Sequence, residues 1–116
     1  MADGTARRDR LGSCRQPQSE RTMHFAIHCT DKPDSAALRA ANRPAHLAHL
    51  ERHAAAILAG GPLLGEDGAS PVGSLLILDF PDRAAAERFA AEDPYAKAGL
   101  FAVVTITPWR QVYPKR

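Results

Sequence analysis

Long apolar runs are missing from this sequence, and so is any apolar leader. Of its 116 residues 45% are hydrophobic, yet no apolar stretch approaches the roughly 18 residues of a membrane span. The first residues contain no apolar segment of about 7–15 residues, as a secretory signal would. The sequence predicts one soluble domain without membrane association or export, and its length leaves no room for a second.

Cysteine is equally scarce. Cys14 and Cys29 are the only two, and they form neither a CxxC motif nor a metal-type spacing. We expect two free thiols in a reducing cytoplasm, and no cofactor. For Cys29, which falls in a predicted strand, a role as a small buried hydrophobe is favoured over a reactive one.

An excess of charge is absent from most of the chain. The net charge is +2, and the first 22 residues account for it, with five arginines against three acidic residues. From Met23 onward ten basic residues balance ten acidic ones, so we expect no nucleic-acid partner. Residues 1–22 are polar and without period, which predicts a disordered N-terminal extension before a folded domain over 23–115. Met23 is an alternative start site.

The first half of the domain shows one strand and one long helix. Met23–Thr30 alternates apolar and polar residues, as a strand with one buried face does. A turn follows, in which Asp34 or Ser35 caps a helix from Leu38 to about Ala59, kinked or restarted at Pro44. Its expected core stripe is apolar, and Gly60-Gly61-Pro62 is expected to stop it; the stripe comprises Leu47, Leu50, Ala54, Ile57 and Leu58.

The second half shows two more strands around a helix, after a short strand at Leu63-Leu64. Val72–Phe80 is apolar on both faces, as in a strand covered on both sides. Asp82 caps a helix over Arg83–Glu92, and Leu100–Thr107 alternates as the last strand. The order β-α-β-β-α-β predicts an α+β, ferredoxin-like fold, with a four-stranded antiparallel sheet and both helices on one face. The bare face is expected to pack against a second copy in a homodimer.

Three histidines form one stripe on the long helix. At 3.6 residues per turn, His46, His49 and His53 fall about 90° from the leucine stripe, at the border between core and solvent. A partly desolvated imidazole there suits acid–base chemistry near neutral pH, although a boundary histidine is more often a plain surface residue. Zinc binding is a weaker alternative because no carboxylate or cysteine completes a four-ligand set, so we expect no metal.

Other polar candidates are less specific. His24 and His28 point to the helix-free face of the first strand, where they line a pocket or cover the dimer seam. Asp93, beside Pro94, is a helix-terminal turn residue on local grounds. Spacing alone does not pair Asp93 with His46.

Six motifs follow one another in a specific order and together resemble the YCII-related family. They cover essentially all of residues 23–113 and are Asp31-Lys32-Pro33, Arg39 with Arg43-Pro44-Ala45-His46-Leu47-Ala48-His49-Leu50, Gly60-Gly61-Pro62-Leu63, Gly73-Ser74-Leu75, Asp93-Pro94-Tyr95 with Ala98-Gly99-Leu100, and Pro108-Trp109. The resemblance implies a ferredoxin-like subunit in a dimeric α+β barrel, with an active site containing a histidine and an aspartate.

Carried over position by position, the resemblance assigns these catalytic roles to His46 and Asp93, with Arg43 as the nearby cation. Ser74 and Tyr95 would supply hydrogen bonds. Some relatives are associated with dehydrochlorination or isomerisation, which implies an enzyme of lyase or isomerase type that moves a proton on a small anionic or phenolic substrate. The alternative is a non-catalytic dimeric module that binds such a small ligand or acts as an accessory protein.

Overall fold

A computed structural model of the chain describes residues 23–114. The segment 1–22, for which the sequence predicts disorder, lies outside the described residues, as do residues 115 and 116. The predicted domain boundaries at 23 and 115 therefore stay predictions.

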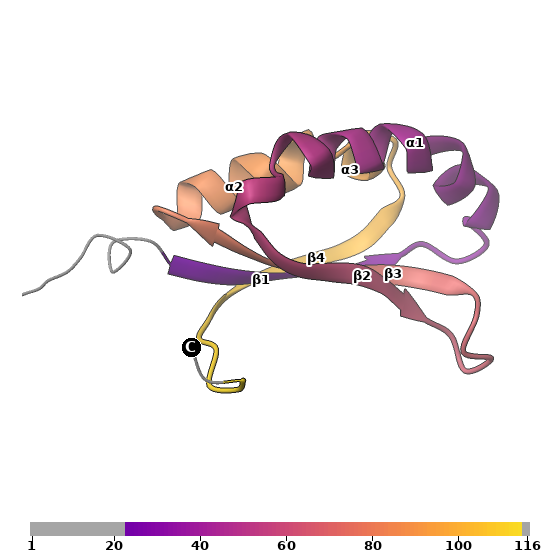
Figure 1. Cartoon of the computed structure of the whole chain (residues 1–116). Coiled ribbons are helices and arrows are strands. Elements are labelled where there is room, and N and C mark those ends of the chain that lie inside the picture. Colours follow the sequence, from indigo (N-terminus) through magenta and orange to yellow (C-terminus); the bar gives the residue numbers. More distant parts are fainter. Residues whose placement is uncertain (1–22, 115–116) are drawn as a thin grey trace, which may run out of the picture.

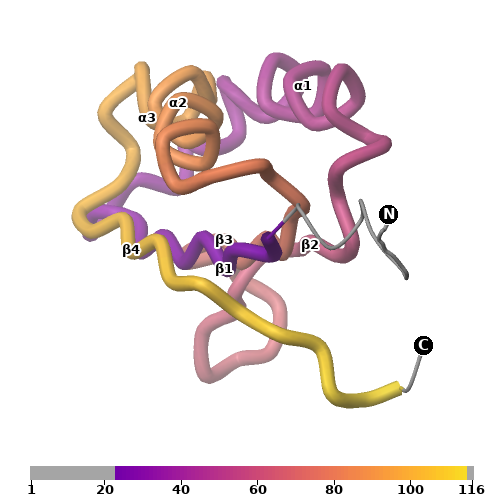
Figure 2. Tube along the Cα trace, turned by 90° about the vertical axis from the view of Figure 1, so that its left-hand side faces the viewer, coloured from indigo at the N-terminus to yellow at the C-terminus, as the bar shows by residue number. Residues whose placement is uncertain are grey.

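The described residues form one sheet covered on one side. The strand order is β2-β3-β1-β4, and all neighbouring strands are antiparallel. The helices lie together on one face of the sheet (Figures 1 and 2). This confirms the predicted ferredoxin-like order. The elements are β1 Met23–Asp31, α1 Ala36–Arg52, the 3-10 turn η2 Ala54–Ala56, β2 Ile57–Leu64, β3 Pro71–Phe80, α2 Arg83–Glu92, α3 Pro94–Lys97 and β4 Phe101–Trp109.

The core lies between the sheet and α2. Strand β1 alternates as expected, with Phe25, Ile27 and Cys29 buried beneath the helices. They pack with side chains of β3 and α2, among them Leu78 and Phe89. Burial raises the pKa of the Cys29 thiol to about 12, with further support from nearby carboxylates. The thiol is therefore protonated at neutral pH and serves as a small core side chain.

Helix α1 differs from the prediction at its C-terminal end. It continues through Pro44 but ends at Arg52 rather than Ala59. The short apolar run after it enters β2, where Ile57 pairs with Leu78 of β3. A short apolar run fits a helix and a strand equally well, and here the backbone hydrogen bonds of β3 decide for the strand.

Gly60-Gly61-Pro62 lies inside β2 and does not act as the predicted helix stop. β2 is an edge strand, so the missing N–H of Pro62 is tolerated there. A Cβ at Gly60 would collide with the side chain of Leu76. Glycine at position 60 therefore leaves the space that the side chain of Leu76 occupies.

The fully buried residues of α1 are polar, which corrects the predicted leucine stripe in part, since Leu50 of that stripe does pack, partly buried, against the core. Arg39, His46 and His49 are the buried residues of this helix, while Leu47 is 43% exposed. His46 and His49 are thus interior rather than at the border, whereas His53 is half-buried, as predicted. Polar side chains are stable in a protein interior when they have hydrogen-bond partners, and each of the three buried residues has one.

Two aspartates fix the ends of the later helices. Asp82 accepts a hydrogen bond from the Ala85 amide at 2.9 Å and caps α2, as predicted. Asp93 ends α2 and caps the short helix α3, with Oδ1 accepting from the Tyr95 amide at 2.9 Å. Ser35 occupies the N-cap position of α1 without a side-chain capping bond.

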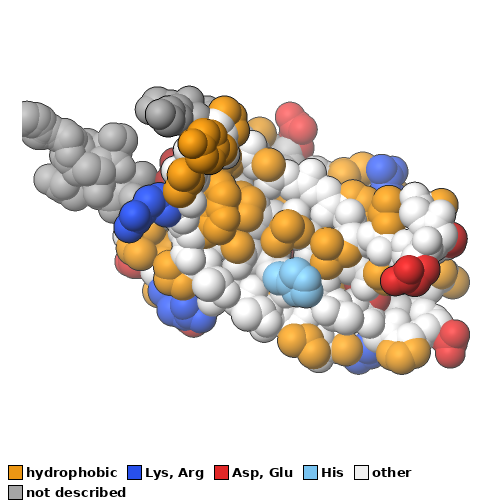
Figure 3. Space-filling model, turned by 90° about the horizontal axis from the view of Figure 1, so that it is seen from below, with side chains coloured by type: hydrophobic (Ala, Val, Ile, Leu, Met, Phe, Trp, Pro, Cys, Tyr) orange, Lys and Arg blue, Asp and Glu red, His pale blue; other side chains and the backbone are white. Residues whose placement is uncertain are grey.

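The helix-free face of the sheet is largely apolar. Figure 3 views it directly and shows apolar side chains and one histidine, with most charged side chains toward the rim. Leu75 and Val103 are among its exposed hydrophobic residues. Within residues 23–114, no helix has the length and apolar character needed to cross a membrane.

Candidate functional site

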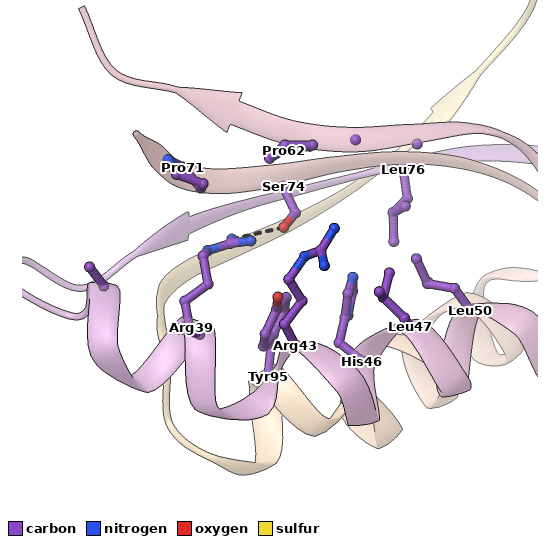
Figure 4. Close-up of a pocket in the computed structure, with 14 residues that line it drawn as sticks. Arg39, Arg43, His46, Leu47, Leu50, Pro62, Pro71, Ser74, Leu76 and Tyr95 are labelled. Carbon is purple, nitrogen blue, oxygen red and sulfur yellow. Dashed lines mark hydrogen bonds between the residues drawn. The ribbon is translucent and has the colours of Figure 1, made fainter. Parts of the chain in front are cut away.

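A cavity of about 470 Å³ lies between α1 and the strands β2 and β3. The end beside Leu47, Leu50 and Leu76 is apolar, and the polar side chains gather from both layers toward the other end, where Pro71 also lies (Figure 4). The polar end is formed by Arg39, Arg43, His46, Ser74 and Tyr95, and the apolar walls by Ala36, Ala40, Leu47, Leu50, Gly60, Gly61, Pro62, Pro71 and Leu76. A small ring with polar substituents at one side matches this division.

His46 and Asp93 meet at the wall of this cavity. His46 Nδ1 lies 2.9 Å from Asp93 Oδ1, and the two residues are only 7% and 4% exposed. A carboxylate oxygen that already receives the Tyr95 amide can only accept, so Nδ1 carries the proton. Nε2 is left as the ring nitrogen available to a ligand.

Tyr95 holds the imidazole from the side. Its ring stacks on His46 with 4.0 Å between centroids and 16° between planes. Because Asp93 caps the helix that begins at Pro94 and carries Tyr95, one short segment positions both the carboxylate and the stacking ring. The imidazole is therefore fixed in rotation and in tilt before any ligand arrives.

Arg39 is a residue of the site that the sequence prediction did not include. Its Nε and Nη2 donate to the two carboxylate oxygens of Asp31 at 2.7 and 3.0 Å. Nη2 also donates to the Gly73 carbonyl at 2.9 Å and to Ser74 Oγ at 3.0 Å. A signal was present in the sequence: seven residues before His46, Arg39 shares its helix face.

Arg43 supplies the net positive charge of the cavity. It lies one turn before His46 on the same face, as predicted, and its guanidinium points into the cavity (Figure 4). Among the described residues it makes no ion pair, whereas Arg39 is neutralised by Asp31. An anionic ligand would therefore meet one uncompensated cation.

The hydroxyl groups of Ser74 and Tyr95 face the same end. Ser74 is 5% exposed and comes from β3, while Tyr95 is almost fully buried. Burial raises the pKa of Tyr95, although the charges of Arg39 and Arg43 act in the opposite direction. The phenol is thus protonated at neutral pH.

The other two histidines of α1 have structural partners. His49 Nε2 donates to the Phe89 carbonyl at 3.1 Å, and its ring stacks on Phe89. Burial is the main cause that lowers the pKa of His49. His53 Nδ1 donates to the His49 carbonyl at 3.0 Å. Within residues 23–114 no three His, Cys, Asp or Glu side chains are grouped as metal ligands would be.

The structure does not bring His24 and His28 to this cavity. Both lie on the helix-free face, because successive residues of β1 alternate between the two sides of the sheet. His24 lies 3.4 Å from an oxygen of Asp79 and contacts the edge of Trp109. Their ligand-binding role in the cavity is thus not supported by position.

The chain resembles proteins of one family over most of its length. The YCII-related domain pattern matches residues 23–110. Protein YciI of Escherichia coli O6:H1 is 35% identical over 98 residues, which is 78% of this chain and 100% of that protein. An uncharacterized protein of Haemophilus influenzae shows the same identity over the same shares.

Solved structures agree with the sequence matches. TftG of Burkholderia phenoliruptrix AC1100, a 5-chloro-2-hydroxyhydroquinone dehydrochlorinase, is 39% identical with a TM-score of 0.72, over 77% of this chain and 95% of that chain. PA3566 of Pseudomonas aeruginosa is 16% identical with a TM-score of 0.52, over 83% and 99% of the two chains, and shows the fold alone.

The fold therefore places the chain in the ferredoxin-like class of the dimeric α+β barrel proteins. Within that class the chain belongs to the YCII-related family. The resemblance noted in the sequence is thereby confirmed.

Proposed function

We propose that this protein is an enzyme of lyase or isomerase type that transfers a proton on a small anionic or phenolic substrate. The observation that carries this proposal is the bond between His46 Nδ1 and Asp93 Oδ1, at the wall of a cavity of ligand size. A buried carboxylate behind an imidazole fixes its tautomer and stabilises its protonated form.

His46 Nε2 would act as the base. It takes a proton from the substrate, and the electron pair released moves through the substrate to expel a leaving group, such as chloride, with its bonding electrons. The net change is loss of HCl, or a shifted proton where nothing leaves. Asp93 stabilises the imidazolium, Arg43 faces the anionic oxygen, and Ser74 and Tyr95 donate hydrogen bonds.

The reaction class rests on the resemblance to TftG. That protein is a dehydrochlorinase, and its structure was solved in complex with 2,5-dihydroxybenzoquinone. The cavity described above has the mixed character that an oxygenated ring requires, with cations at one end and leucines at the other. We therefore propose a ring bearing hydroxyl or oxo groups as the substrate.

The test is His46→Ala, assayed with 5-chloro-2-hydroxyhydroquinone by chloride release. We expect turnover by the wild type and none by the variant, with a Tm that falls no further than that of His49→Ala, which also loses a buried ring. His53→Ala is the matched control, because His53 lies on the same helix outside the cavity and should retain activity. A fall in the Tm of His46→Ala beyond that of His49→Ala would instead make His46 a structural residue.

A non-catalytic binding module is the second candidate, since Arg43 and the apolar walls suffice to hold an anion without proton transfer. This alternative predicts saturable binding of 2,5-dihydroxybenzoquinone to a protein that never releases chloride from the chlorinated compound. Detected chloride release that depends on His46 would dismiss it.

We further propose a homodimer that joins the helix-free faces of two sheets, with His24 and His28 in the seam. Leu75 lies on this face, opposite His28 in the β1–β3 register. Leu75→Glu should yield a monomer in sedimentation equilibrium. Ala91→Glu, on the exposed side of α2, should leave the dimer intact. A wild-type monomer would contradict the proposal.

We also infer a cytoplasmic location. The motivating observation is the free, buried thiol of Cys29. Fractionation of the native host would check it, and recovery of the protein in an oxidising compartment would contradict it.

A further inference from the structure

At the polar end of the cavity, the hydroxyl proton of Ser74 points in a defined direction. Ser74 Oγ lies 3.0 Å from Nη2 of Arg39. A guanidinium has donors and no acceptor, so Ser74 can only accept in this bond. Its own O–H must point elsewhere, and among the described residues it has no hydrogen-bond acceptor. Ser74 is 5% exposed, so this is a buried donor beside the cavity.

Arg39 keeps this orientation fixed. Its two bonds to Asp31 and its bond to the Gly73 carbonyl join α1 to β1 and β3. The paired side chains of Arg39 and Asp31 are 10% and 6% exposed. The charges of Arg39 and Asp31 thus neutralise each other within the protein. Arg39 sets direction at the site rather than adding net charge.

Tyr95 adds a second hydroxyl to the site. The Arg39 guanidinium lies 4.7 Å from the centroid of its ring, and the Tyr95 oxygen points toward the cavity between Arg39 and Arg43 (Figure 4). Among the described residues this hydroxyl has no hydrogen-bond acceptor, so it can donate its proton to a ligand in the cavity.

We propose that Ser74, Tyr95 and Arg43 form an oxyanion-binding site and that Arg39 is its positioning residue. The site takes a substrate oxygen that is deprotonated, or that gains negative charge during reaction: a phenolate, an enolate or a carboxylate. This inference rests on the proposed function, since the same cavity holds the His46 base. It narrows the substrate to compounds with an oxygen that is ionised when bound or that becomes negatively charged during the reaction.

The preference for an anionic ring follows from the hydroxyl protons that Ser74 and Tyr95 can donate to it. An oxyanion accepts from two hydroxyls and a cation, and hydrogen bonds to charged groups are the stronger ones. The neutral hydroxyl of a hydroquinone is a weaker acceptor than an oxyanion, so it gains less from the same two hydroxyls and the cation. The site should therefore bind an anionic ring more tightly than a neutral ring of the same size.

The experiment is calorimetric titration of the wild type and variants with 2,5-dihydroxybenzoquinone, an acid ionised at neutral pH, and with neutral hydroquinone. We expect the wild type to prefer the anion. Ser74→Ala and Tyr95→Phe should each weaken binding of the anion by about 10- to 100-fold, the effect of losing a hydrogen bond to a charged group. Binding of hydroquinone should change by less than about threefold.

Two matched controls are available, one just before β3 and one on α1. Ser70→Ala removes an exposed hydroxyl beside β3 and should change neither constant. Arg52→Ala removes a cation nine residues after Arg43, on the opposite side of α1, and should also be neutral where Arg43→Ala is not. Equal binding of both probes by the wild type, or binding of neither, would overturn the proposal.

The role of Arg39 has its own readout. Arg39→Lys keeps the charge and loses the planar fork. It should lower the preference for the anion to the level of Ser74→Ala, and the double variant should add nothing, because both changes remove the same directed proton. Additive effects would make Arg39 merely structural. If Arg39→Lys does not fold, Ser74→Ala and Tyr95→Phe decide the proposal by themselves.

This test separates the two proposals. His46→Gln should retain the preference for the anion while losing turnover. Chloride release without any selectivity for the anion would support the proposed enzyme and contradict the oxyanion site. Selective binding of the anion without turnover would support the oxyanion site and contradict the proposed enzyme.

Discussion

His46 and His49 lie one turn apart on α1, and both are buried, yet they have different surroundings. His46 donates a hydrogen bond from Nδ1 to the carboxylate of Asp93, and its Nε2 faces the cavity. His49, 1% exposed, donates to a backbone carbonyl and stacks on Phe89 in the core. At His49, desolvation by burial is the main effect and lowers its pKa, which favours the neutral imidazole. The partner, not the residue type, thus separates a candidate base from a structural histidine.

The largest effect on activity is expected from changing the hydrogen-bond partner of His46. Asp93→Asn keeps an oxygen that can cap α3 but removes the negative charge behind the imidazole. We expect chloride release to fall by about 10²- to 10⁴-fold, the range of general acid–base catalysis. The measurement is kcat with 5-chloro-2-hydroxyhydroquinone, alongside Tm. Activity within about threefold of the wild type would show that Asp93 does not assist His46.

Removing His49 should affect the fold and not the chemistry. His49→Ala deletes a buried ring and leaves the Phe89 carbonyl without its donor. We expect a loss of about 2–4 kcal/mol in the free energy of unfolding, measured with urea. The kcat at a temperature where the variant is folded should equal that of the wild type. A selective loss of kcat would place His49 in the catalytic machinery.

Acid should expose the same difference without mutation. The pKa of His49 is lowered by burial, with His53 and Arg52 acting in the same direction and Asp93 against it. Below the ordinary value of about 6.5 the unfolded chain therefore binds a proton that the folded chain does not, so stability falls as pH falls through that range. The Tm of wild type from pH 7.5 downward should fall more steeply than that of His49→Leu. Parallel curves would contradict this cause.

The smallest effect is expected at the third histidine. His53 is half-buried and donates to the His49 carbonyl at the end of α1. His53→Ala should lower the free energy of unfolding by less than about 1 kcal/mol, with kcat unchanged. A larger loss would mean that the aromatic cluster around Phe89 depends on His53.

Local patterns were sufficient for most elements. The alternation in β1, the cap at Asp82 and the apolar run in β3 each predicted an element within a residue or two of its observed bounds. The end of α1 was predicted wrongly because residues 54–59 are compatible with both periods. Their pairing with β3, visible only in the folded sheet, decided the outcome.

The candidate site was predicted in part. Resemblance to the family paired His46 with Asp93, which spacing alone did not do, and the two side chains do meet. The spacing of Arg39 from His46 placed it on the same helix face, but its bonds to Asp31, Gly73 and Ser74 come from two other strands and could not be predicted from that spacing. His24 and His28 lie on the helix-free face, as predicted, but this position does not support the substrate-binding role in the cavity that was also considered for them.

The sequence by itself determined the order of strands and helices and the buried face of β1, because these depend on side-chain periods of two and 3.6 residues along the chain. The buried face of α1 was decided by packing. Only the tertiary structure decided what each buried polar group contacts. His46 and Asp93 are 47 positions apart, and the contact between them exists because α1 packs beside α3. Hydrogen-bond partners in an interior are set by packing between distant elements, and that packing determines which histidine can accept a proton.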